Sequence, residues 1–292
     1  MKRKEEDRIQ LYANRKVLQC VEAAFDFIRA NRRVWVKSAL VLFLPICVAL
    51  SLVAIPTTQT QINNAQNYIW ERFFEMESWH FDFFLIVTCV GIWLAYVHVY
   101  ALLLAEFQRE EGVKTAQLSS LIPYFLRSAS RSWWLFAVPI ALALIMNIGV
   151  LFALLLPIIL VPLSLLPSIF ILEHESMPTA ISKSFRLGFS SWFYLAFNII
   201  LTMMLALCMV WLLQVPSLVM DIFMDILPKN ADYALGHLPF YIFWMIFSTF
   251  SCFGFCVVVS MLVLGCAFQY GSVSERVDDT SILHEIENFE NL

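Results

Sequence analysis

Residues 133–172 read WWLFAVPIALALIMNIGVLFALLLPIILVPLSLLPSIFIL, a run of forty residues without one Asp, Glu, Lys or Arg. A continuous α-helix of this length would extend about 60 Å, twice the ~30 Å thickness of the hydrocarbon core of a bilayer. Backbone N–H and C=O groups must pair internally in lipid, so we expect the run to cross a membrane twice as a helical hairpin. We predict its turn near residues 151–157.

The composition of the whole chain lies outside the range of soluble globular proteins. Of its 292 residues, 60% are hydrophobic and only 14% are charged, and the mean hydropathy is +0.74. These values predict a polytopic membrane protein of the all-α class. Residues 1–34 carry nine Lys and Arg before the first apolar run, which does not fit a cleaved signal peptide.

A criterion of about 20 apolar residues per span predicts six transmembrane helices in one membrane domain over residues 1–270. The predicted spans cover about residues 35–55, 83–105, 133–153, 154–172, 192–214 and 239–268. Residues 216–228, which are bounded by prolines, are expected to form a separate helix at the membrane surface. Residues 271–292 are predicted to be a polar, acidic tail.

The positions of Lys and Arg predict how the chain is oriented. Seventeen of the 19 basic residues fall on one side of the six predicted spans, and only Arg72 and Lys229 fall on the other. The positive-inside rule therefore predicts that both termini and the acidic tail are cytoplasmic.

An arginine lies six residues before a tryptophan at the start of three predicted spans. The pairs are Arg29 and Trp35, Arg127 and Trp133, and Arg186 and Trp192. A short amphipathic pattern precedes each pair and predicts a helix in the membrane interface. We interpret the pairs as lipid anchors in three repeats of one surface helix and two spans. Alternatively, Arg and Trp mark every cytoplasmic boundary without a repeat.

The fourth predicted span contains Pro157, Pro162 and Pro167, each of which disturbs a helix. Such a span is either a bent packing helix or the lining of a binding site, as in transporters. The candidate polar residues for an intramembrane site are His98, Asn147 and Asn198. A histidine within a span can carry protons, and more often it bonds to a neighbouring helix.

Other reactive side chains carry weaker signals. Glu173, His174 and Glu175 resemble metal ligands in type, but consecutive helical residues point to different sides, so we expect them at the water boundary. Seven cysteines fall mostly in apolar runs without a C-x-x-C pair, and we interpret them as buried free thiols. No nucleotide-binding, metalloprotease or serine-hydrolase motif occurs. We therefore predict no enzyme, no cofactor, no metal and no nucleic-acid partner.

The Arg-to-Trp boundaries, residues 157–167 and the segment EHESMPTAISKSF at 173–185 resemble a broad group of bacterial six-helix membrane proteins. The group includes YciC-like proteins and the membrane domain of some glycerophosphodiester phosphodiesterases. The resemblance implies a compact bundle of surface helices and spans in the bacterial cytoplasmic (inner) membrane. It implies no catalytic residue, because the soluble barrel of those phosphodiesterases has no counterpart in this chain.

These observations lead to two main functional hypotheses. The first is a non-enzymatic scaffold, accessory subunit or membrane-homeostasis factor, with membrane lipids and a partner membrane protein as candidate partners. The second is a small-solute or lipid transporter, which needs a cavity where the proline-broken span meets Asn147, Asn198 and His98. An intramembrane enzyme is a third alternative, although no pair of nucleophile and base stands out.

Overall fold

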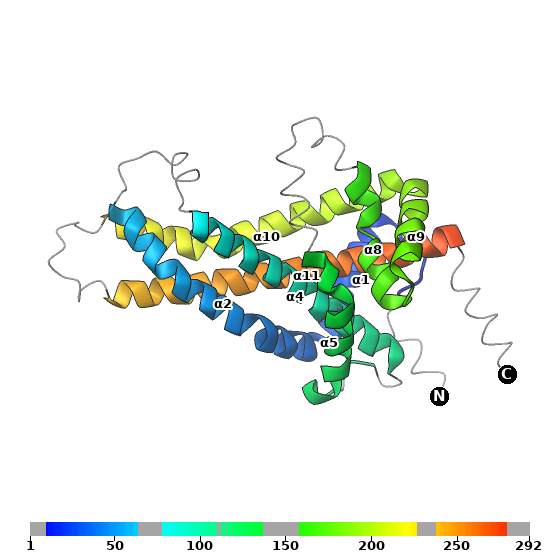
Figure 1. The fold of residues 1–292 in the computed structure, drawn as a ribbon, viewed down its shortest axis with the longest axis horizontal. Coiled ribbons are helices and arrows are strands. Elements are labelled where there is room, and N and C mark those ends of the chain that lie inside the picture. Colours follow the sequence, from blue (N-terminus) through cyan, green and yellow to red (C-terminus); the bar gives the residue numbers. More distant parts are fainter. Residues whose placement is uncertain are drawn as a thin grey trace.

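The computed structural model describes residues 10–63, 78–109, 112–114, 116–136, 158–226 and 238–278, and all regular elements within these ranges are helices. This confirms the predicted all-α class. Four long helices run along the molecule and shorter ones gather near one end (Figure 1). The long helices are α2 (Arg32–Asn63), α4 (Ser78–Gln108), α10 (Trp192–Ile226) and α11 (Leu238–Asp278). The short ones are α1 (Val17–Ala30), α5 (Leu118–Ser132), the 3-10 helix η2 (Trp133–Phe136), α8 (Leu166–Leu172) and α9 (Met177–Ser190).

The four long helices contain segments long and apolar enough to cross a membrane, which indicates a membrane protein. They correspond to the first, second, fifth and sixth predicted spans. Helix α11 continues to Asp278, so residues 271–278 belong to this helix and not to a separate tail. The rest of the predicted tail lies outside the described residues.

The apolar run at 133–172 is described only at its two ends. Residues 137–157, with most of the third predicted span and the predicted hairpin turn, lie outside the described residues. The final part, Ile158–Leu172, is an apolar helix that a turn at Ser164 and Leu165 interrupts. At 1.5 Å per residue it reaches about 22 Å, which is less than a bilayer core. The structure therefore shows four of the six predicted spans.

Helix α11 lies at the centre of the bundle and packs against α1, α2, α4, α8, α9 and α10. Near the short helices, its Phe268 meets Phe27 of α1 with ring centroids 6.2 Å apart, and both side chains are fully buried. Edge-to-face aromatic packing of this kind adds about 0.5–1.5 kcal/mol to the effect of burial. This contact fixes α1 against the central helix.

Helix α10 presents an apolar face to the surroundings of the protein. Phe193, Trp211 and Leu212 are 84%, 69% and 72% exposed. A monomer in water rarely exposes so continuous an apolar surface, whereas lipid covers it without cost. The exposure therefore supports the assignment of α10 as a membrane span.

The separate surface helix predicted at residues 216–228 is wrong, because α10 continues through Pro216 to Ile226. A proline inside a helix deprives the preceding turn of a backbone donor. Pro216 leaves the carbonyl oxygen of Leu212 without its helical donor, and in the same turn Ser251 Oγ of α11 donates to the neighbouring carbonyl oxygen of Leu213 at 3.0 Å. Serine side chains on neighbouring helices are a recognised way to keep a proline within a transmembrane helix.

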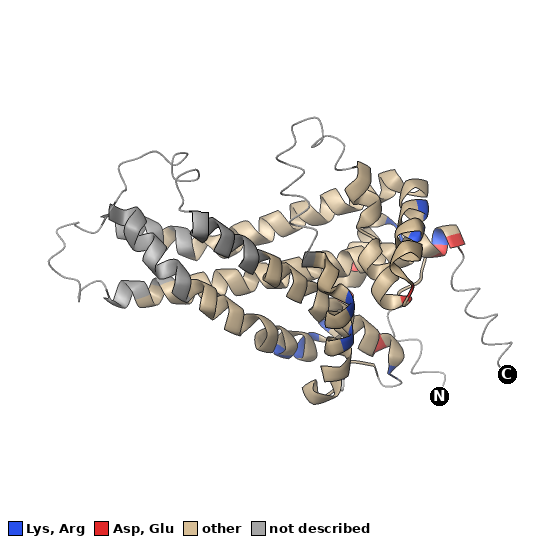
Figure 2. Cartoon of the chain, in the orientation of Figure 1, with Lys and Arg blue, Asp and Glu red and all other residues tan. Residues whose placement is uncertain are grey.

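Lys and Arg of the described ranges lie at the end of the bundle where the short helices gather (Figure 2). We call this region the charged end; it comprises α1, α5, α8 and α9 with the adjoining ends of α2, α4, α10 and α11. This segregation is what the positive-inside rule requires of a membrane protein. That the charged end is cytoplasmic stays a prediction.

Candidate functional site

The three amphipathic helices predicted from the sequence are present at the charged end as α1, α5 and α9. Each packs one face against the bundle, including Phe27 of α1, Leu121 of α5 and Leu187 of α9. Their other faces expose large apolar side chains at levels from 37% to 70%: Leu18, Phe25, Ile122, Leu126, Ile181 and Phe189. The helices therefore have apolar side chains both inside the protein and on its surface.

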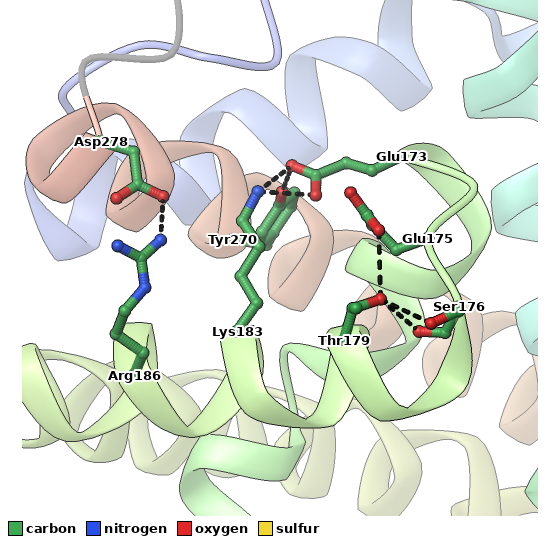
Figure 3. A network of polar contacts seen from close by, with 8 residues as sticks. All are labelled: Glu173, Glu175, Ser176, Thr179, Lys183, Arg186, Tyr270 and Asp278. Carbon is green, nitrogen blue, oxygen red and sulfur yellow. Dashed lines mark hydrogen bonds and ion pairs between the residues drawn. The ribbon is translucent and has the colours of Figure 1, made fainter.

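The carboxylate of Glu173 is the centre of a polar network that joins three parts of the chain (Figure 3). Lys183 of α9 donates to its two oxygens at 2.8 and 2.7 Å. Tyr270 of α11 donates its hydroxyl to the same carboxylate. The side chains of Glu173 and Lys183 are only 15% and 26% exposed, so solvent screens their attraction weakly.

The start of α9 has its own hydrogen bonds in the same region. Ser176 is the extended N-cap residue and Pro178 occupies the first turn, as its fixed φ favours. Thr179 donates to Glu175 at 3.1 Å and lies 2.9 Å from the hydroxyl of Ser176 (Figure 3). These contacts orient α9 so that Lys183, one turn further on, faces Glu173.

The segment before α1 is held against the end of α11. Tyr12 packs edge-on against Tyr270 with centroids 6.2 Å apart. Burial, followed by the negative charge of Glu173, raises the pKa of Tyr12 to about 12, so its phenol stays neutral at physiological pH. The backbone N–H of Arg15 donates to Ser272 Oγ at 3.0 Å, and Arg276 donates to Asn14 Oδ1 at 3.2 Å.

Gly271 allows this close approach. The carbonyl oxygen of Leu11 occupies the position where a Cβ atom at residue 271 would lie. A side chain here would push residues 10–16 away from α11. No local pattern predicts this contact, because it joins residues more than 250 positions apart.

The three residues at 173–175 lie in the loop between α8 and α9, and not in a helix as the prediction assumed, and they bond to separate partners. Glu173 bonds to Lys183, Glu175 accepts from Thr179, and His174 Nε2 accepts from Arg127 of α5 at 2.7 Å. His174 has a φ of 61°, an uncommon value for a residue with a side chain. Burial, and then the charges of Arg127 and Arg131, lower the pKa of His174, so its neutral form is favoured.

The predicted anchor tryptophans lie in three different environments. Trp133 is 68% exposed, Trp192 is half-buried, and Trp35 is only 2% exposed. Trp35 packs against Phe27 and His98, so it is a core residue and not a lipid contact, which corrects the anchor interpretation at this position. The three copies are therefore not equivalent, and the repeat stays a prediction.

The predicted anchor arginines also differ in their contacts. The side chain of Arg186 is 60% exposed and pairs with Asp278 at 2.7 Å. Arg127 is exposed and bonds to His174, whereas Arg29 is exposed at the end of α1. All three lie at the charged end, where the prediction placed them.

His98 occupies an aromatic environment inside the bundle. It is fully buried, and its ring centroid lies 4.6, 5.4 and 6.5 Å from those of Trp35, Phe43 and Phe125. Its Nε2 lies 2.8 Å from Ser38 Oγ, which is the bond to a neighbouring helix that we considered for this residue. A transport pathway through His98 would need a cavity where these aromatic rings are packed.

Of the other proposed intramembrane residues, Pro162, Pro167 and Asn198 lie within the described part of the chain. Asn147 and Pro157 lie outside the described residues. Pro167 lies in the first turn of α8, and the carbonyl oxygen of Pro162 accepts from Ser184 Oγ of α9 at 2.6 Å. Asn198 is buried in α10, and its side-chain amide has no hydrogen-bond partner among the described residues. The broken helix thus packs against α9, as a bent packing helix would.

No family model, curated protein or solved structure matches the chain. The resemblance to YciC-like membrane proteins therefore stays a prediction.

One cluster of reactive side chains was missed in the sequence. Cys47 of α2 meets Cys252 and Cys256 of α11, and their sulfur atoms all lie within 4.8 Å of one another. Cys252 and Cys256 are four residues apart, so a shared helix face was predictable. Cys47 was not, because its position depends on how α2 packs against α11.

Proposed function

We propose that this chain is a non-enzymatic scaffold or accessory protein of the bacterial inner membrane whose charged end binds anionic lipid headgroups. The observation that carries the proposal is the combination of exposed apolar and exposed basic side chains on the outer surface of this end. Such a surface inserts its apolar groups at the boundary of the hydrocarbon while its cations contact phosphate. The resemblance to YciC-like proteins supports the bacterial inner membrane.

The junction of α1 and α2 is the part of this surface best suited to phosphate. Arg29, Arg32 and Arg33 are exposed, and Lys37 follows one turn later. Asn31 between the helices is 4% exposed, and its backbone N–H bonds to Phe27, so the junction has a fixed shape. Each cation near an anionic membrane surface contributes about 1 kcal/mol to binding.

The network around Glu173 supports a structural role and not a catalytic one. The carboxylate of Glu173 already accepts hydrogen bonds from Lys183 and Tyr270, so its negative charge is balanced by a cation of the protein itself. A side chain that acts as a general acid or base must itself lie within hydrogen-bond reach of the substrate atom that gains or loses the proton. This network instead stabilises α9 and α11 in the positions that expose the outer surface.

The membrane orientation completes the proposal. The positive-inside rule favours a cytoplasmic charged end, with both termini on that side. The cytoplasmic leaflet carries the anionic lipids that attract basic segments. An accessory role follows if the same outer faces of α1, α5 and α9 also receive a partner membrane protein.

The test is native mass spectrometry of the chain released gently from a membrane that contains phosphatidylglycerol and phosphatidylethanolamine. We expect the wild type to retain phosphatidylglycerol preferentially. The combined variant Arg29→Gln, Arg32→Gln and Arg33→Gln should lose most of this preference. The matched control is Asp26→Asn, which changes an exposed charge of opposite sign on α1 and should retain the lipid.

Two results would contradict the proposal. Equal phosphatidylglycerol retention by the triple variant would exclude the α1–α2 junction as the binding surface. Retention of one small solute that disappears in Asn198→Ala would favour a transporter with a site between α10 and its neighbours. A stoichiometric protein partner lost in the triple variant would support the accessory role.

A further inference from the structure

The three clustered thiols lie within the membrane-spanning part of the bundle. Cys47 is fully buried in α2, Cys256 is 5% exposed, and Cys252 is half-buried in α11. At 1.5 Å per residue, Cys47 lies about 18 Å along α2 from Trp35 at the start of the apolar segment. This depth is close to the middle of a ~30 Å hydrocarbon core.

The spacing of the thiols fits a single metal ion. A thiolate binds a metal such as zinc at about 2.3 Å, so three sulfur atoms around one ion in a plane are about 4 Å apart. The observed separations, all within 4.8 Å, need only a small closure of side-chain rotamers. The cluster also combines two helices, so its geometry is set by the packing of α2 against α11.

The surroundings hold the cluster in place and give it polar neighbours on one side. A Cβ atom on Gly91 of α4 would lie 3.7 Å from Cys256 Sγ, so α4 closes one side of the cluster. A pair of hydroxyl groups lies about one turn beyond the thiols, on the side opposite the charged end. Thr249 donates to Ser51 Oγ at 2.9 Å, and Ser51 donates to the carbonyl oxygen of Cys47 at 2.8 Å. These hydroxyl groups extend the polar contact between α2 and α11 beyond the thiols.

We propose that Cys47, Cys252 and Cys256 bind one Cu(I) ion inside the membrane. Sulfur ligands select soft ions, chiefly Cu(I) and zinc, over magnesium or calcium. Structural zinc is almost always held by four ligands, whereas the cluster supplies three. Binding releases the protons of the coordinating thiols to solvent, because thiolates are the ligands.

The test uses the full chain in detergent under nitrogen, with Cu(I) supplied as its tetrakis(acetonitrile) complex in competition with bicinchoninate. We expect one copper per chain in the wild type. Each of Cys47→Ser, Cys252→Ser and Cys256→Ser should weaken binding by about a hundredfold, since one of three donors is lost. Cys266→Ser is the matched control, because Cys266 is a half-buried thiol on α11 outside the cluster.

A second measurement does not depend on the folding of any variant. X-ray absorption of the copper-loaded wild type should show sulfur ligands only, at about 2.3 Å. Nitrogen or oxygen ligands, absence of copper binding, or displacement of the bound copper by an equal concentration of zinc would overturn the proposal. Equal binding by the wild type and the three cluster variants, with circular dichroism showing all of them folded, would overturn it as well.

Discussion

Glu173 holds three parts of the charged end together with one carboxylate. Replacement by Gln keeps the size of the side chain but removes the charge that Lys183 and Tyr270 share. Leaving a partly buried cation without its partner costs about 1–3 kcal/mol. We therefore expect Glu173→Gln to lower the melting temperature of the protein in detergent.

Glu175→Gln provides the comparison for this change. Glu175 is exposed and accepts only from Thr179 in the described contacts, so its neutralisation should have a much smaller effect. Equal losses in the two variants would show that the Glu173 network does not hold α9 and α11 together.

His174 makes the stability of the charged end depend on pH. Its pKa is lowered in the folded protein from an ordinary value of 6.5, because of burial and the neighbouring Arg127 and Arg131. Above about pH 6.5, neither the folded nor the unfolded state binds this proton. As the pH falls below that value, the unfolded state binds the proton first, so the free energy of unfolding decreases.

We expect the melting temperature to fall between about pH 7 and pH 5, with a smaller fall in His174→Asn. Asparagine does not titrate and tolerates the positive φ at this position better than most residues. The same fall in both proteins would assign the pH dependence to other groups.

Few residue roles were predictable from the helical pattern. Residues 173–175 were expected to point to different sides of a helix, but they lie in the loop between α8 and α9, so helix geometry does not account for their separate partners. The burial of Trp35 was not predictable, because it depends on the packing of α2 against α4. The meeting of Cys47 with Cys252 depends in the same way on two helices that are distant in sequence.

The contact between the broken helix and α9 can be tested through Gly188. A Cβ atom at this position would lie 2.5 Å from the Cα and Cβ atoms of Pro162. Neither atom can rotate away, so one helix must shift, at a cost of about 1–3 kcal/mol. We expect Gly188→Ala to lower the melting temperature and to raise protease sensitivity near α9.

Gly91→Ala serves as the control for Gly188→Ala. The new methyl group would meet Cys256 Sγ at 3.7 Å, which is ordinary van der Waals contact. Alanine also favours a helix by up to about 1 kcal/mol over glycine. A larger loss in Gly91→Ala than in Gly188→Ala would contradict the packing described for α9.

The elements themselves were more predictable than their ends. The surface helices α1, α5 and α9 were predicted because amphipathic periodicity is local. The end of α10 was misplaced because Pro216 was taken to stop the helix, whereas Ser251 of α11 bonds to the preceding turn. The sequence of α10 alone does not indicate that Ser251, on another helix, donates a hydrogen bond to it.

The distribution of charge over the whole molecule predicts which regions reagents can reach from each side of the membrane. We expect Gln117→Cys, at the exposed start of α5, to react with an impermeant maleimide only in inside-out vesicles. Val219→Cys, at the opposite end of α10, should react only in right-side-out vesicles. Labelling of both positions from the same side would exclude the proposed orientation.

At the scale of the molecule, the sequence predicted the all-α class and the four long apolar helices. Hydropathy detects such helices because each must cover its own length of membrane. The close packing of residues 10–16 against α11 was not predictable, since it depends on Gly271 and on hydroxyl partners at the far end of the chain. Two further predicted spans lie mostly or partly outside the described residues.

The contact between residues 10–16 and α11 has a consequence for biosynthesis. Arg15 is translated early, and its partner Ser272 follows 257 residues later. At about 5–20 residues per second, the interval is on the order of 13–50 s. During this interval residues 10–16 have been synthesised, but their partners on α11 have not. The charged end is therefore complete only after Ser272 has been synthesised and α11 has packed against residues 10–16.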